Sequence, residues 1–85
     1  MLKLVTFVPE AYADLVRTTL FNAGAGAIGG YDSCSFSLPG SGTFRAGEGT
    51  NPFCGEIGEL HVESEIRIET ILPAFRKSTV TRALL

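Results

Sequence analysis

The sequence predicts an α+β fold of the ferredoxin-like, split βαβ kind, with two helices on one face of an antiparallel sheet and the last strand of that fold missing. Three observations support this. A strand followed by a helix opens the chain, the spacing of apolar residues changes from 3.6 to 2 after Ala27, and a long strand followed by a helix closes it. The 85 residues are expected to form a single domain spanning 1–85.

The first pair of elements is a strand over LKLVTFVP, residues 2–9, and a helix that begins at Pro9 and Glu10. Alternating hydropathy with β-branched and aromatic side chains predicts a central strand. Proline and glutamate suit the first turn of a helix, where a missing N–H costs nothing and a carboxylate meets the positive end of the helix dipole. One apolar stripe follows at helical spacing: Tyr12, Leu15, Val16, Thr19, Leu20 and Ala23. Gly24 is expected to end the helix.

The middle of the chain predicts a hairpin and a loop. Residues 31–38, YDSCSFSL, alternate as a strand whose inward face carries Asp32, Cys34, Phe36 and Leu38. The sequence PGSG at 39–42 is expected to break this strand, so that 43–45 return as its antiparallel partner. Residues 46–59 show no period and predict a long loop, and loops of that length in compact domains usually have a function.

The last pair of elements is a long strand and a helix. Residues 62–72 alternate between an apolar face and a charged face, so that one face is expected to meet water or a partner. Pro73 opens a helix whose apolar stripe begins at Val80, Ala83 and Leu84.

Composition narrows the function. Hydrophobic residues make up 45% of the chain, charged residues 19%, and the net charge is −2, which is typical of a globular protein that does not bind nucleic acid. Basic residues form no run: they are Lys3, Arg17, Arg45, Arg67, Arg76, Lys77 and Arg82. Because no apolar segment reaches membrane-spanning length and the first residues do not resemble a signal peptide, we expect a cytoplasmic protein without membrane contact.

The glycine-rich stretch from Gly40 to Gly58 is the candidate ligand site. Its exposed backbone N–H groups and one cation suit an anion, with Ser41, Thr43, Arg45, Thr50 and Asn51 as the binding set. The competing interpretation is that glycine and proline simply build turns, in a subunit contact or a lid. The glycines from Gly24 to Gly30 follow a helix, whereas a dinucleotide-binding motif follows a strand, so they are interpreted as helix termination.

No catalytic residue, metal site or cofactor is predicted. His61 is the only histidine and is expected at a strand end on the surface, because Cys34 and Cys54 would make an unusual metal-ligand set with it. Both cysteines are expected to be reduced and half-buried, and Cys34 to be structural. The carboxylates of residues 63–69 alternate with Arg67 along one strand face, which favours a solvated or intersubunit surface over acid-base catalysis.

Long gapped motifs give the chain a family resemblance. The segments LVTFVPE, AGAGAIGGYDSCSF, GSGTFRAGEGTNPFCGEIGEL and IRIETILP resemble, in order, the insert domain of the Ngg-interacting factor three family, also called GTP cyclohydrolase 1 type 2-like proteins. Ala46, Gly47 and His61 depart from the family's usual residues. The resemblance covers nearly the whole chain. It implies a fold similar to the PII and CutA proteins, which are ferredoxin-like trimers.

The resemblance also implies a function. In the larger family members two metal ions lie between flanking halves, and the motifs that bind them, like the segment leading to the last strand, are absent from this sequence. We therefore expect a module that is not an enzyme, forms a homo-oligomer, preferably a trimer, and caps or gates the metal-binding halves. Residues 29–59 would supply the oligomer contact and a cap. The alternatives are a small-ligand or metal-ion sensor like PII and CutA, and a hydrolase activity located in the flanking halves.

Overall fold

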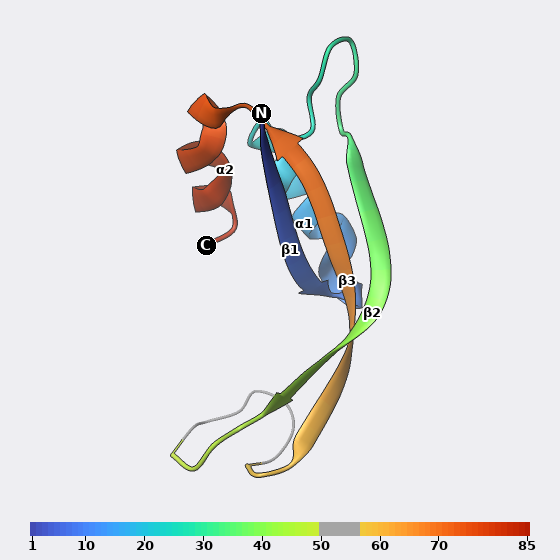
Figure 1. Cartoon of the computed structure of the whole chain (residues 1–85), viewed down its shortest axis with the longest axis vertical. Helices are drawn as coiled ribbons and strands as arrows, with labels where there is room; N and C mark the ends of the chain where they lie inside the picture. Colours follow the sequence, from blue (N-terminus) through green and yellow to red (C-terminus); the bar gives the residue numbers. More distant parts are fainter. Residues whose placement is uncertain (50–56) are drawn as a thin grey trace.

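A computed structural model describes residues 1–49 and 57–85 of the chain and contains three strands and two α-helices (Figure 1). The strands are β1 (Leu2–Pro9), β2 (Ser35–Arg45) and β3 (Leu60–Leu72). The helices are α1 (Ala13–Asn22) and α2 (Lys77–Ala83), and each follows one turn of 3₁₀ helix, η1 (Glu10–Tyr12) or η2 (Ala74–Arg76).

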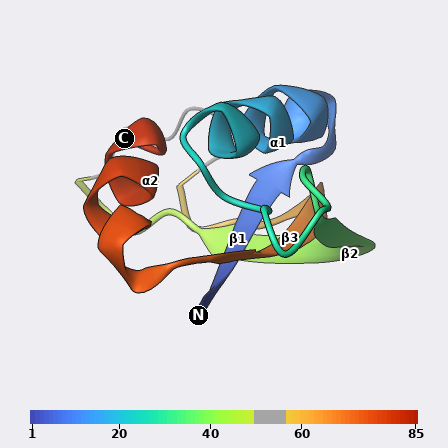
Figure 2. The ribbon, with the colours of Figure 1, turned by 90° about the horizontal axis from the view of Figure 1, so that it is seen from above.

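The sheet is antiparallel, in the order β1-β3-β2, and both helices cover the same face of it (Figure 2). The predicted α+β, split βαβ arrangement is confirmed at this level. The prediction that residues 2–9 form a central strand is wrong within the described residues, because β3 lies in the middle and β1 at an edge. β1 has the apolar alternation of a covered strand since α1 packs over one of its faces.

The buried face of α1 is rotated from the predicted stripe. Leu20 is completely buried and Ala13 nearly so, whereas Leu15 is 64% exposed. Each helical residue advances by about 100°, which leaves Leu15 about 140° around the helix from Leu20. The three-stranded sheet covers only the side of α1 that carries Ala13, Val16 and Leu20. As predicted, Gly24 follows the end of the helix in the left-handed conformation, with φ +106°.

β2 differs more from the sequence prediction than any other element does. It runs without a break from Ser35 to Arg45 and pairs with β3 along its whole length, so the predicted strand end at 39–42 and hairpin return at 43–45 are wrong. An edge strand tolerates Pro39 because its outer side needs no N–H donor. The strand also begins later than predicted, since Tyr31 pairs with Ile28 in a tight turn.

The face of β2 that meets the helices is the small polar one. Ser35 and Ser37 lie opposite Thr70 and Ile68, two fully or almost fully buried residues of β3. The Arg17 side chain of α1 donates a hydrogen bond from Nε to Ser37 Oγ at 3.1 Å. Phe36 therefore points to the opposite face, where it is 61% exposed, and the predicted inward face of this strand is wrong.

The core lies between the helices and the upper part of the sheet. Its buried members are Val8, Ala13, Leu20, Ala25, Ile68, Leu72 and Val80. Below the core, β2 and β3 continue as a two-stranded extension, drawn at the bottom of Figure 1. We call residues 41–49 and 57–65 the arm. No helix in the described ranges has the length and hydropathy needed to cross a bilayer.

Candidate functional site

The sheet face without helices is the main exposed feature of the molecule. We call its side chains on the three strands the open face: Val5 and Phe7 of β1, Phe36 and Leu38 of β2, and Glu65, Arg67 and Glu69 of β3, with Lys3. The strand pairing places Val5 and Phe36 on either side of Glu69, and Phe7 and Leu38 on either side of Arg67. The open face thus has a charged centre between two apolar margins.

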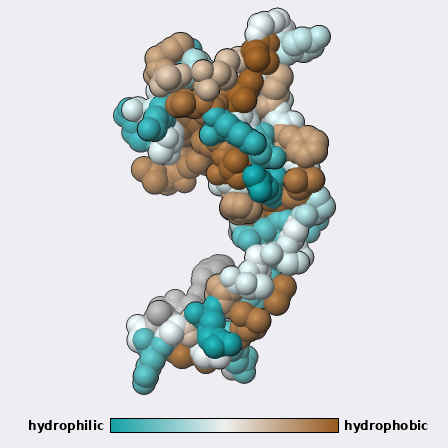
Figure 3. Space-filling view, viewed as in Figure 1, coloured by the Kyte–Doolittle hydropathy of each residue, from teal (hydrophilic) through white to brown (hydrophobic). Residues whose placement is uncertain are grey.

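The apolar margins are exposed to solvent. Val5, Phe7, Phe36 and Leu38 have between 39% and 61% of their surface accessible. Figure 3, which views this side, shows hydrophobic residues beside hydrophilic ones across the sheet. Exposed apolar residues that gather on one face mark interaction sites more often than scattered ones do.

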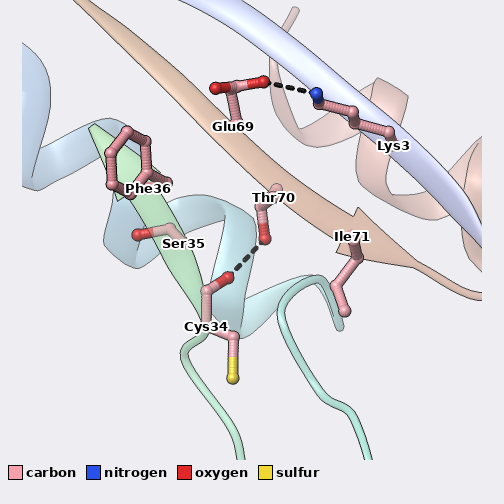
Figure 4. A pocket seen from close by; sticks show the side chains of 7 residues that line it. All are labelled: Lys3, Cys34, Ser35, Phe36, Glu69, Thr70 and Ile71. Atoms are coloured by element: carbon pink, nitrogen blue, oxygen red, sulfur yellow. Dashed lines mark hydrogen bonds and ion pairs between the residues drawn. The ribbon is translucent and has the colours of Figure 1, made fainter. Parts of the chain in front are cut away.

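The charged centre is held together by ion pairs around Glu69. Lys3 Nζ lies 2.6 Å from Glu69 Oε1 (Figure 4). An Arg67 nitrogen lies 3.5 Å from the same oxygen. The hydrogen bond from Lys3, with the charges of Lys3 and Arg67, holds the pKa of Glu69 below its ordinary value, although partial burial opposes this shift. The Arg67 guanidinium also lies 5.9 Å from the centre of the Phe7 ring.

We expect the Glu69 ion pairs to make stability depend on acidic pH. Because its pKa is lowered in the folded state, the carboxylate stabilises the fold above the ordinary glutamate pKa, and this contribution is lost as pH falls through the folded-state pKa. Glu69→Gln should therefore weaken the dependence of the urea midpoint on pH between about 6 and 3.

Glu10→Gln is the matched control for this pH series. Glu10 is exposed on η1 and has no ion pair in the described part of the chain. An equal flattening in both variants would contradict a specific role of the Glu69 pairs.

A shallow hollow of about 360 Å³ lies at the upper end of the open face. It is lined by Lys3, Cys34, Ser35, Phe36, Glu69, Thr70 and Ile71. Figure 4 shows that the Thr70 hydroxyl points away from the Lys3–Glu69 pair and toward the Cys34 backbone, to whose oxygen it donates a hydrogen bond at 2.7 Å. The Cys34 thiol is half-buried, as predicted, and lies 3.7 Å from the Asp32 backbone oxygen. Cys54 lies outside the described residues.

The predicted ligand residues lie on the arm. Ser41, Thr43 and Arg45 are alternate residues of β2, opposite Ser64, Val62 and Leu60, and therefore share one face of the extension. Their backbone is extended, so neighbouring N–H groups point in opposite directions instead of converging on one anion. These residues offer two hydroxyls and a guanidinium. Thr50 and Asn51 lie outside the described residues, and binding by this set stays a prediction.

His61 lies at the start of β3, as predicted, but other side chains cover much of it. Its Nε2 is 2.7 Å from Glu63 Oε2, and its ring centre is 4.8 Å from that of Phe44. Its side chain is 27% exposed. Across residues 1–49 and 57–85, no three His, Cys, Asp or Glu side chains gather in a way that could hold a metal ion.

The apolar residues on the open face were not among the predicted site residues. Phe36 and Leu38 were expected to face the core, and no role was predicted for Val5 and Phe7. A usable signal was present: β3 has one apolar and one charged face, so the residues that flank its charged face had to lie on the side without helices.

Comparison with known proteins finds similar sequences and a similar structure. It is 48% identical to the "GTP cyclohydrolase 1 type 2 homolog" of Halalkalibacterium halodurans over 98% of its own length, and 45% identical to the protein of the same name from Bacillus subtilis. A crystal structure described as a Bacillus cereus protein related to NIF3 superimposes with a TM-score of 0.81 at 46% identity, over 95% of this chain and 20% of that one. A comparison with protein-family models gave no match.

These relatives are much longer than the chain, which spans 22% of the length of the two curated proteins. Sequence and fold agree over nearly all of the 85 residues, as the motifs predicted. The chain is therefore similar, over nearly all of its length, to a segment of about a fifth of the GTP cyclohydrolase 1 type 2 homologs and of the NIF3-related structure.

Proposed function

We propose that the chain is a non-catalytic assembly module, which joins three copies through the open face and, in the longer family members, caps or gates the space enclosed by the flanking halves. The observation that carries this proposal is the open face itself. Four apolar side chains from β1 and β2 are exposed there around a charged centre.

A second copy is the occupant that best matches this face. Its centre contains both signs of charge, Lys3 and Arg67 with Glu65 and Glu69, so it can face another copy of itself without a net repulsion. Its apolar margins would gain roughly 25 cal/mol for each Å² removed from water. Open faces on antiparallel sheets can remain in water, but aromatic residues there are typical of interface centres.

The arm supports the same proposal. A two-stranded ribbon is at best marginally stable alone in water, and beyond the end of β1 nothing in the described residues pairs with the second edge of β3. The arm also exposes Phe44, Ile57, Leu60 and Val62. Contact with a neighbouring copy would cover these side chains and supply the missing support.

A single exposed substitution tests the open face. We expect Leu38→Ser to weaken self-association by at least about tenfold, because it places a hydroxyl in the apolar margin. Leu15→Ser is the matched control: Leu15 is also exposed, but it lies on α1. The measurement is mass by light scattering over a concentration series, with far-UV circular dichroism to show that both variants fold. Equal association of Leu38→Ser and the unmodified chain would exclude the open face as the contact.

A further inference from the structure

Charge is divided unevenly between the two ends of the molecule. The arm carries four carboxylates, Glu48, Glu59, Glu63 and Glu65, and one cation, Arg45. The segment formed by η2 and α2 carries Arg76, Lys77 and Arg82 and no acidic residue. One end of the chain is therefore acidic and the other is basic.

The cations of this C-terminal segment differ from those of the sheet and α1. Lys3 and Arg67 pair with Glu69, and Arg17 pairs with Asp14. Arg76, Lys77 and Arg82 are all exposed, and none forms an ion pair with a carboxylate of the described residues. Their charge remains available to another molecule.

The acidic arm cannot satisfy these cations within one chain. The molecule is 48 Å long, and Figure 1 shows the arm at one end and α2 beside the upper part of the sheet, near the other. α2 packs against α1 and follows η2. A contact between the arm and α2 must therefore join two copies.

We propose that the basic surface of α2 in one copy receives the acidic arm of the next. The contact joins different surfaces of the two copies, and such a contact closes into a ring when the rotation between copies is suitable, as in a trimer. This inference rests on the proposed function, since it assigns the partner of the arm in the same assembly.

The surface of α2 offers a place for acidic side chains. A hollow of about 400 Å³ is lined by Lys77, Ser78, Thr81, Arg82 and Leu85. It combines two cations and two hydroxyl donors, which suit carboxylates. On the arm, the acids lie next to exposed apolar residues such as Ile57 and Leu60, and these can cover the aliphatic parts of Lys77 and Arg82.

A charge exchange tests this contact. The first variant reverses the sign of two charges on α2 (Lys77→Glu with Arg82→Glu), and the second does the same on the arm (Glu48→Lys with Glu59→Lys). The third variant combines all four changes. All six side chains used, including those of the control below, are exposed in the single chain. Each pair alone should weaken association about five- to tenfold at low salt, because two attractions become repulsions, and the combination should restore it.

The control is Glu10→Lys with Asp32→Lys, which changes the net charge by as much as the arm variant does but lies on η1 and in the loop after α1. Association is measured by sedimentation in about 0.05 M and 0.5 M salt, since salt screens exposed charges. Weakening by each pair, restoration in the combination and no change in the control would support the proposal.

Three results would overturn it: unchanged association in the single-pair variants, no restoration in the combination, or equal weakening in the control. If the unmodified chain associates in any of these cases, only the arm-to-α2 contact fails and the assembly module stands. A chain that stays monomeric at every concentration would instead contradict the proposed function itself.

Discussion

Leu20→Ala is expected to lower the free energy of unfolding by about 2–5 kcal/mol, the usual cost of truncating a buried leucine. Leu20 has no exposed surface and packs in the core formed by α1, α2 and the sheet. Because a small domain has only about 5–15 kcal/mol of stability in total, the variant should lose a large part of it and unfold at a clearly lower urea concentration.

Leu15→Ala provides the comparison within the same helix. Both residues belong to the stripe that the sequence predicted, but Leu15 is 64% exposed and should lose less than about 0.5 kcal/mol. The two variants are measured by urea denaturation followed by circular dichroism. Equal losses would show that α1 buries the face predicted from the sequence and not the face found here.

Gly26→Ala is expected to be the most damaging substitution outside the core, with a cost of about 1–3 kcal/mol or more. Gly26 has φ +83°, and a Cβ there would lie 2.9 Å from the Cys34 backbone nitrogen, which cannot move like a flexible side chain. Its backbone hydrogen bonds link the end of β3 to the residue before β2. The Gly26 N–H donates to Ile71 O at 2.7 Å, and the Gly26 carbonyl accepts from Cys34 N–H at 2.9 Å.

Gly30→Ala is the control for this glycine. No atom lies within 4 Å of the position that its Cβ would occupy, and its φ is not in the left-handed region. We expect a change of less than about 0.5 kcal/mol, or a small gain from a less flexible unfolded chain. Thermal denaturation of both variants checks the difference, and comparable melting temperatures would contradict the packing argument for Gly26.

Most helices and strands could be predicted from the sequence. β1, α1, β3 and the start of the C-terminal helix were found because their apolar residues repeat with the period of the element, and because Pro9 and Pro73 mark the strand-to-helix turns. The order of these elements was enough to give the split βαβ arrangement.

The orientation of β2 could not be predicted in the same way. Alternation shows that a strand has an apolar and a polar face, but it does not say which one meets the helices. Phe36 and Leu38 gave the apolar face, yet Ser37 is the residue that contacts α1 through Arg17. If a second copy covers the open face, Phe36 is buried in the assembly just as a core residue is buried within one chain. Periodicity cannot distinguish these two kinds of burial.

The sequence predicted the structure of the candidate site less accurately than it predicted the fold. The stretch from Gly40 to Gly58 was expected to contain a turn, a short return strand and a loop, and its first six residues instead extend β2 into the arm. Glycine and proline were taken as turn signals, although pairing with the long strand β3 outweighs their weak strand propensity. Sequence alone also gave no indication that the arm and α2 lie far apart.

The most direct test of the assembly module is the mass of the 85-residue chain in solution, measured by light scattering from low to high concentration beside Leu38→Ser. We expect the mass of the unmodified chain to rise to three times its 9.0 kDa and that of Leu38→Ser to remain closer to 9.0 kDa over the same range. A folded, unmodified chain that stays at 9.0 kDa at every concentration would contradict the assembly module.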